Sequence, residues 1–136
     1  MSQAATQKNL VLILARDLSS RLATSVALMD ADGTVIYYNE AAATLFGRPF
    51  VEGTEITAEQ WREEMPAVDE EGEPIPFSER AVGVVLTRHE PAHRELHVRG
   101  VDGFVRPIEA TAIPLFAHAG EFIGGMVLFW ERPEDA

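Results

Sequence analysis

The sequence contains no cysteine among its 136 residues. This absence excludes disulfide bonds, metal sites built from thiolates and every mechanism that needs a cysteine nucleophile. Positive charge is scarce as well, since 11 Lys and Arg face 22 Asp and Glu, which leaves a formal net charge of −11. Such a chain repels phosphate backbones and anionic lipid, so we expect neither nucleic acid nor a membrane as a partner.

A long apolar run is also missing. The longest one near the start of the chain, residues 10–15 (LVLILA), is followed at once by Arg16 and Asp17. It is too short for a membrane span or an ordinary signal peptide, so we expect a cytoplasmic protein. The chain length and its 46% apolar content are enough for one domain with a single core.

The first 24 residues predict an amphipathic helix. Charged and hydroxyl side chains fill one side of it, and leucines recur every four positions on the other side: Leu10, Leu14, Leu18 and Leu22. This stripe needs an apolar partner, which we expect to be a sheet of the same or a neighbouring subunit.

Residues 26–38 predict a β-hairpin, because two β-branched and aromatic runs flank the turn residues DADG at 30–33. The second run passes without a loop into a helical pattern, in the stretch YYNEAAATLFG at 37–47. Asparagine is among the best N-cap residues, because its side-chain oxygen accepts from a free amide of the first helical turn. We therefore predict that Asn39 closes the strand and caps a helix that ends at Gly47, before Pro49.

Residues 52–79 are unusually acidic, with ten carboxylates, three prolines and a single base, Arg62. This composition predicts short helices and loops, with Trp61 and Met65 on one inward face and a solvated loop at 69–74. The charge has a second interpretation, a docking surface for a basic partner, although charge runs mostly keep loops solvated. Residues 77–90 predict a further helix that stops before Pro91.

Three strands follow, at 94–99, 104–116 and 122–130. The first alternates, with Leu96 and Val98 on one face and polar residues on the other. The last, FIGGMVLFW, is apolar on both faces and must therefore be covered on both sides.

This order of elements resembles the PAS domain family. The matching stretches are SVALMDADGTVIYYNEAAATLFG at 25–47, PFSERAVGVVLTRHEP at 76–91, HVRGVDGFVRPIEATAIPLF at 97–116 and GEFIGGMVLFWE at 120–131. The resemblance implies an α+β fold: a five-stranded antiparallel sheet with short connecting helices on one face and an N-terminal amphipathic helix. It divides the chain into that helix at 1–24, a PAS domain at 25–132 and a tail at 133–136.

The resemblance also implies a small pocket between the inner face of the sheet and the helices. By position, ten residues should line it: Trp61, Val82, Val85, Leu96, Val98, Ile108, Ala110, Ala112, Val127 and Phe129. Small residues at 110, 112 and 125 are expected to leave this space open. The alternative is that bulky neighbours fill it and no ligand binds, because interiors are close-packed by default.

The outer face of the last strand predicts a dimer. Its apolar side chains cannot face water as a patch without cost, and the N-terminal leucines lack a partner. We expect a homodimer interface built from Leu10, Leu14, Leu18, Leu22, Met126, Leu128 and Trp130. A helix that merely covers its own sheet in a monomer is the alternative.

Metal and cofactor chemistry finds little support in the residues. HEPAH at 89–93 matches the H-E-x-x-H zinc pattern, but that pattern needs a regular helix and Pro91 prevents one. Some PAS sensors hold haem through a histidine near the end of the long helix, where His89 lies, yet its charged neighbours are typical of an exposed surface. The flavin adduct of light sensors and the thioester-linked chromophore of photoactive yellow protein both need a cysteine.

We therefore expect a sensory and signalling PAS module, in two-component or transcriptional regulation, rather than an enzyme. It binds a small apolar ligand, such as a fatty acid or an aromatic metabolite, or acts by dimerisation. The alternative is a ligand-free module for protein–protein pairing, and a haem-binding gas or redox sensor is a distant third. Two alternatives stay open for the output: a stand-alone sensor, or a last strand that leads into a signalling output domain or protein, as it commonly does in this family.

Overall fold

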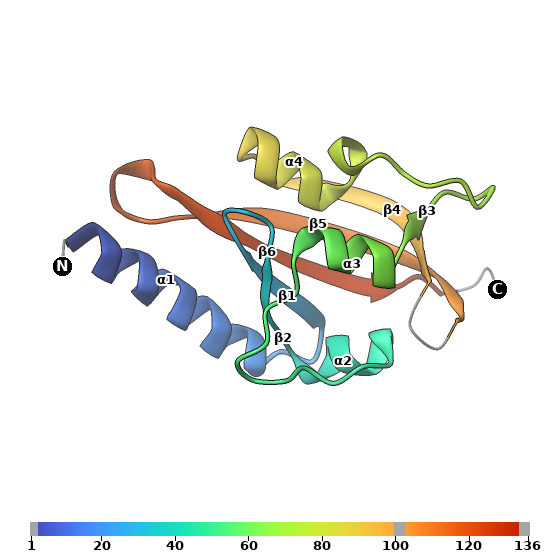
Figure 1. Ribbon diagram of the computed structural model, residues 1–136, viewed down its shortest axis with the longest axis horizontal. Helices are drawn as coiled ribbons and strands as arrows, with labels where there is room; N and C mark the ends of the chain where they lie inside the picture. Colours follow the sequence, from blue (N-terminus) through green and yellow to red (C-terminus); the bar gives the residue numbers. More distant parts are fainter. Residues whose placement is uncertain (1–2, 100–102, 134–136) are drawn as a thin grey trace.

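A curled antiparallel sheet runs through the centre of the computed structural model, which describes residues 3–99 and 103–133 (Figure 1). Its strands are β1 (Ser25–Asp30), β2 (Val35–Tyr38), β3 (Ala67–Val68), β4 (Ala92–Arg99), β5 (Val105–Phe116) and β6 (Phe122–Glu131). They lie in the order β2-β1-β6-β5-β4-β3, and each neighbouring pair is antiparallel. The sheet therefore has one strand more than the five predicted. The extra strand, β3, pairs with β4 over two residues, too few to show any alternation in sequence.

The helices are α1 (Gln3–Ser20), α2 (Glu40–Phe46), α3 (Ala58–Glu64) and α4 (Ala81–Arg88), with 3₁₀ turns η1 (Phe77–Glu79) and η2 (His118–Gly120). The predicted helix over 77–90 is in fact η1 and α4, separated by Arg80 in an extended conformation. The two pieces pack closely, because a Cβ atom on Gly83 would lie 1.8 Å from the carbonyl oxygen of Phe77. Within the described ranges, no helix is long and apolar enough to cross a membrane.

Apolar side chains cover the sheet on both faces, as the composition of β6 predicts. On the inner face, Val127 and Phe129 join the main core with α2, α3 and α4. On the outer face, Met126 and Leu128 join a smaller cluster that includes Ala15 of α1. Figure 1 shows α1 on the side of the sheet opposite α4, so the sheet separates α1 from the main core.

Asn39 makes the strand-to-helix junction as predicted. Its backbone is extended, with φ −81° and ψ 177°, and its side chain accepts a hydrogen bond from the amide of Ala42 at 3.0 Å. Gly47 ends α2 in the left-handed conformation, with φ 76°, where a side chain would be strained. The helix α2 is therefore fixed at both ends by the residues that the sequence singles out.

Asn39 also has a role that the cap motif does not predict. Its side chain is 2% exposed, and its oxygen accepts a second hydrogen bond from the amide of Val26 at 3.0 Å. Its nitrogen donates to the carbonyl oxygens of Ser19 at 2.9 Å and Thr24 at 2.8 Å. One side chain therefore joins the end of α1, the start of β1 and the start of α2.

The acidic connector folds into short pieces, which confirms its prediction. Thr57 begins α3 with a capping box: its side chain accepts from the amide of Gln60, and the side chain of Gln60 accepts from the amide of Thr57. Residues 70–74 are exposed, and the carboxylate of Asp69 accepts from the amides of Glu71 and Glu73. All of the predicted tail at 133–136 except Pro133 lies outside the described residues.

Candidate functional site

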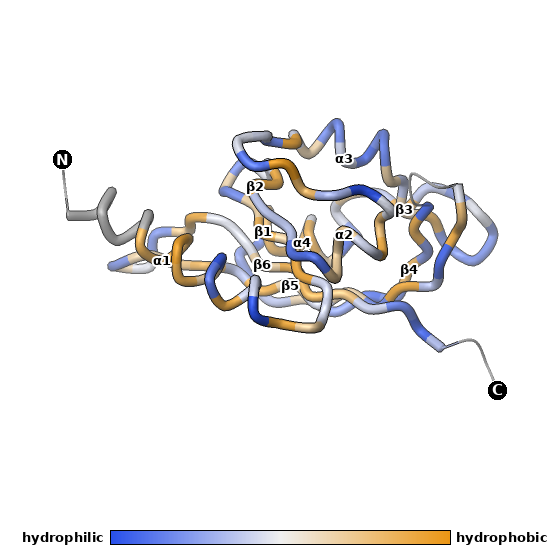
Figure 2. Tube along the Cα trace, turned by 90° about the horizontal axis from the view of Figure 1, so that it is seen from below, coloured by the Kyte–Doolittle hydropathy of each residue, from blue (hydrophilic) through white to orange (hydrophobic). Residues whose placement is uncertain are grey.

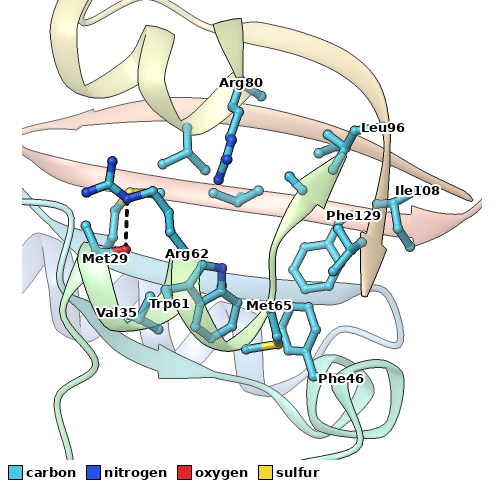
Figure 3. A pocket seen from close by; sticks show the side chains of 18 of the residues that line it. Met29, Val35, Phe46, Trp61, Arg62, Met65, Arg80, Leu96, Ile108 and Phe129 are labelled. Atoms are coloured by element: carbon cyan, nitrogen blue, oxygen red, sulfur yellow. Dashed lines mark hydrogen bonds between the residues drawn. The ribbon is translucent and has the colours of Figure 1, made fainter. Parts of the chain in front are cut away.

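A cavity of about 120 Å³ lies between the inner face of the sheet and the helices that cover it (Figure 3). All six strands contribute side chains, and α2, α3, η1 and the start of α4 close it on the other side. The lining is almost entirely apolar. From the sheet and the β1–β2 turn it comprises Ala27, Met29, Gly33, Val35, Ala67, Leu96, Val98, Arg106, Ile108, Ala110, Val127 and Phe129; from the helices it comprises Leu45, Phe46, Ala58, Trp61, Arg62, Met65, Phe77, Arg80, Ala81 and Val82.

Eight of the ten residues expected at the pocket line this cavity: Trp61, Val82, Leu96, Val98, Ile108, Ala110, Val127 and Phe129. The other two, Val85 and Ala112, are fully buried in the same core but do not line it. The reason is visible at Gly125, where a Cβ atom would lie 2.9 Å from a methyl carbon of Val85. The missing side chain of Gly125 thus lets α4 pack closely against β6, which leaves no space between them. Of the small residues at 110, 112 and 125, only Ala110 lines the cavity.

Aromatic rings form one wall of the cavity. The ring of Phe46 contacts Trp61 edge-on at 4.8 Å between centroids and stacks on Phe129 at 4.9 Å. Tyr38 packs behind them at 5.8 Å from Phe46, and its hydroxyl donates to the carbonyl oxygens of residues 48 and 49. Burial raises the pKa of Tyr38 above 10.0, which the charge of Arg48 opposes. Trp61 and Met65 share the inward face that the sequence predicts.

Three arginines interrupt the apolar lining. Arg106 of β5 pairs with the carboxylate of Glu131 at 3.5 Å. Arg80 donates from Nε and Nη2 to the carbonyl oxygen of Ile75, at 3.0 and 2.8 Å. Arg62 donates from Nε to a backbone carbonyl of α3, and its guanidinium lies 4.9 Å from the centre of the Phe77 ring. Burial lowers the pKa of Arg80, and the charge of Arg62 lowers it further.

Comparison with known proteins identifies the fold. The sequence matches the family described as PAS fold over residues 19–135. The chain belongs to the PAS family. Proteins of this family generally serve sensing and signalling rather than catalysis, and PAS domains commonly dimerise and link to output domains.

Solved structures agree with this assignment. The PAS domain of BvgS from Bordetella pertussis has 20% sequence identity and a TM-score of 0.61, with 90% of this chain and 86% of that chain covered. The PAS domain of nitrogen regulation protein NR(II) from Vibrio parahaemolyticus has 16% identity and a TM-score of 0.61, with 88% and 98% covered. The light-state dimer of the fungal blue-light photoreceptor Vivid has 18% identity and a TM-score of 0.59, with 96% and 95% covered. At these identities the likeness concerns the fold alone, and no curated protein sequence matches the chain.

The histidine considered for haem does not reach the PAS cavity. His89 is the C-terminal cap of α4, with φ 56°, and its exposed ring stacks on Phe122 at 3.9 Å. The residues from 89 to 93 run through this cap into β4 and form no helix, as Pro91 predicts. The lining of the cavity, as far as the described residues define it, contains no histidine, asparagine or glutamine.

The seven residues expected at a dimer interface fall into two groups. Leu10, Leu14, Leu18 and Trp130 are exposed, at 51%, 58%, 53% and 38%. The other three, Leu22, Met126 and Leu128, belong to the outer cluster, which Ala15 of α1 joins. Helix α1 therefore covers its own sheet with a face other than the leucine stripe.

Sequence reasoning missed several lining residues, and some left a signal. Arg62 is the single base in an acidic connector, which marks it as unusual. Phe46 is the last residue of a helix whose position Asn39 and Gly47 define. Met29, Val35 and Arg80 carry no such signal, because only the curl of the sheet and the break between η1 and α4 bring them to the cavity.

Proposed function

We propose that this chain is a sensory PAS module that holds a small apolar ligand in the cavity and reports on it through the pairing of two copies along α1. The observation that carries the proposal is the cavity itself, which is enclosed by the sheet on one side and by the helices on the other. A ligand there would contact elements on both sides at once. Its output would be an attached domain or a partner protein.

The size of the cavity suits a small guest. An engineered protein cavity of about 150 Å³ lined by apolar side chains binds benzene, so about 120 Å³ fits a single ring or a short branched chain. An empty cavity of this volume would cost roughly 3 kcal/mol, at about 24 cal/mol per Å³. A ligand that fills it would recover part of that free energy.

A path of direct contacts joins the cavity to α1. Phe46 lines the cavity and ends α2, and Asn39 begins α2. The side chain of Asn39 donates to the carbonyl oxygen of Ser19 near the end of α1 and to that of Thr24, directly before β1. A ligand acts through such a path only if it binds two arrangements of these elements with different affinity.

The exposed face of α1 supports pairing. Leu10, Ile13, Leu14 and Leu18 are between 51% and 61% exposed, whereas Ala15 on the other side is buried against the sheet. Four large apolar side chains gathered on one helix face are a costly surface for a monomer. Figure 2 shows hydrophobic stretches, in orange, along α1, which lies at one end of the molecule. Vivid, a structural relative, was solved as a dimer.

A native mass spectrum of protein purified without added cofactors tests the proposal. A dimer that carries a discrete extra mass per subunit is the expected result. A dimer without any extra mass favours the alternative, a ligand-free pairing module. A mass that corresponds to haem would support the gas or redox sensor, and a monomer at high protein concentration would contradict the pairing.

A further inference from the structure

The lining of the cavity, over the described residues, holds three arginines and no aspartate or glutamate. Acidic residues outnumber basic ones two to one in this chain, and Arg16, Arg21 and Arg48 each pair with a carboxylate. Within the described residues, Arg62 and Arg80 have no carboxylate partner, although both line the cavity. For Arg80, which is partly buried, the lack of a counter-ion is costly, because burial removes water that would solvate its charge.

Both side chains retain donors for a ligand. A guanidinium carries five N–H groups. Arg80 spends Nε and Nη2 on the carbonyl oxygen of Ile75, which holds the side chain in place and leaves Nη1 unused within the described chain. Among the described residues, Arg62 donates only from Nε, which leaves its two terminal nitrogens for a ligand.

The two arginines lie on different elements beside the same space. In Figure 3, Arg80 reaches from the start of α4 toward the cavity, and Arg62 extends from α3. Arg62 is exposed and Arg80 is partly buried, so this side of the cavity meets solvent. Helix α4 begins at Ala81, which also lines the cavity, and no side chain caps it, so the positive end of its dipole adds to the local potential.

We propose that the ligand is a small carboxylic acid, with one aromatic ring or a short branched chain in the cavity and its carboxylate against Arg80 and Arg62. This inference rests on the proposed function, because it names the ligand class of the same cavity. The aromatic wall of Phe46, Trp61 and Phe129 contacts the apolar body. The carboxylate supplies an acceptor and a counter-charge to both guanidiniums, and its negative charge opposes the burial and the repulsion from Arg62 that lower the pKa of Arg80.

The test compares phenylacetate with its neutral isostere phenylacetamide, by titration calorimetry at low ionic strength. A hydrogen bond to a charged group contributes about 1.5–3 kcal/mol, so phenylacetate should bind at least about tenfold more tightly than the amide. Added salt should reduce this preference. Equal affinity for the acid and the amide would overturn the carboxylate proposal and leave the ligand-binding function intact. If neither probe binds at millimolar concentration, the carboxylate proposal fails, and the native mass spectrum decides the ligand-binding function separately.

Variants locate the anion. Arg62→Gln should weaken phenylacetate binding several-fold and Arg80→Gln more than tenfold, with phenylacetamide binding nearly unchanged. Arg88→Gln is the matched control, because Arg88 is exposed at the far end of α4, does not line the cavity and carries the same charge. A loss of binding in Arg88→Gln as large as in Arg62→Gln would mean diffuse attraction and would overturn the site. Arg80 also holds the carbonyl oxygen of Ile75, so the binding data for Arg80→Gln count only if its circular dichroism spectrum matches that of the wild type. If the spectrum differs, the test depends on Arg62→Gln alone.

Discussion

Replacement of Asn39 by alanine tests whether this residue is a helix cap or a central anchor of the fold. As a cap alone, it contributes about 1 kcal/mol. The structure adds two buried hydrogen bonds, from the amide of Val26 and to the carbonyl oxygen of Ser19, and a partly buried one to the carbonyl oxygen of Thr24. At about 1 kcal/mol each, they bring the expected loss for Asn39→Ala to about 4 kcal/mol. That is a large share of the roughly 5–15 kcal/mol that stabilises a typical domain.

Thr57→Ala is the matched control. Thr57 caps α3 with the same kind of side-chain hydrogen bond, but it is exposed, and within the described part of the chain its hydroxyl makes no hydrogen bond to another element. Its loss should cost about 1 kcal/mol. Urea unfolding followed by circular dichroism, at one fixed protein concentration, measures both losses. Because a domain of this size loses roughly 4 °C per kcal/mol, the melting temperature should fall by roughly 15 °C for Asn39→Ala and 4 °C for Thr57→Ala.

Asn39→Asp separates the two roles further. It keeps the oxygen that caps α2 but replaces the donor to Ser19 and Thr24 with an acceptor, so a carboxylate faces two carbonyl oxygens. We expect a loss as large as that of Asn39→Ala at pH 7, with partial recovery as the pH falls toward 4 and the acid becomes protonated. Equal, small losses for Asn39→Ala and Thr57→Ala, with a neutral Asn39→Asp, would refute the anchor.

Three further predictions concern the cavity, the dimer and alkaline pH. Ala110→Leu should fill the cavity and abolish retention of any ligand in native mass spectra, with stability kept or raised by about 1 kcal/mol; a loss above about 2 kcal/mol would mean that side chains already fill the space. Leu14→Glu should convert a dimer into a monomer in light scattering without a change in the far-ultraviolet spectrum, whereas an unchanged mass would place the interface elsewhere. Burial raises the pKa of Tyr38, so the stability that comes from its neutral hydroxyl is fully present below pH 10.0. This stability is lost as the pH rises through the pKa of Tyr38 in the folded protein. Above pH 10 the wild type should therefore lose more stability in urea titrations than Tyr38→Phe does, and parallel losses would contradict this origin.

Much of the fold could be predicted from local signals. The alternation of β4, the two apolar faces of β6 and the capping chemistry of Asn39 are properties of neighbouring residues, and they placed most elements correctly. The break between η1 and α4 was missed, because it depends on the contact of Gly83 with the carbonyl of Phe77. The strand β3 was missed because its two residues gain their pairing only from β4.

The features of the cavity also fall into two groups, those that the sequence predicts and those that depend on tertiary packing. The sequence by itself determined the inner face of the sheet, since a period of two places every second residue of β4, β5 and β6 on that face. It also determined that one side of α1 is apolar. Only the tertiary structure decided that α4 closes the space at Gly125, that Arg80 and Arg62 reach one cavity, and that α1 leaves its leucines exposed. These outcomes depend on how far apart separate elements pack, and no local pattern of residues encodes that distance.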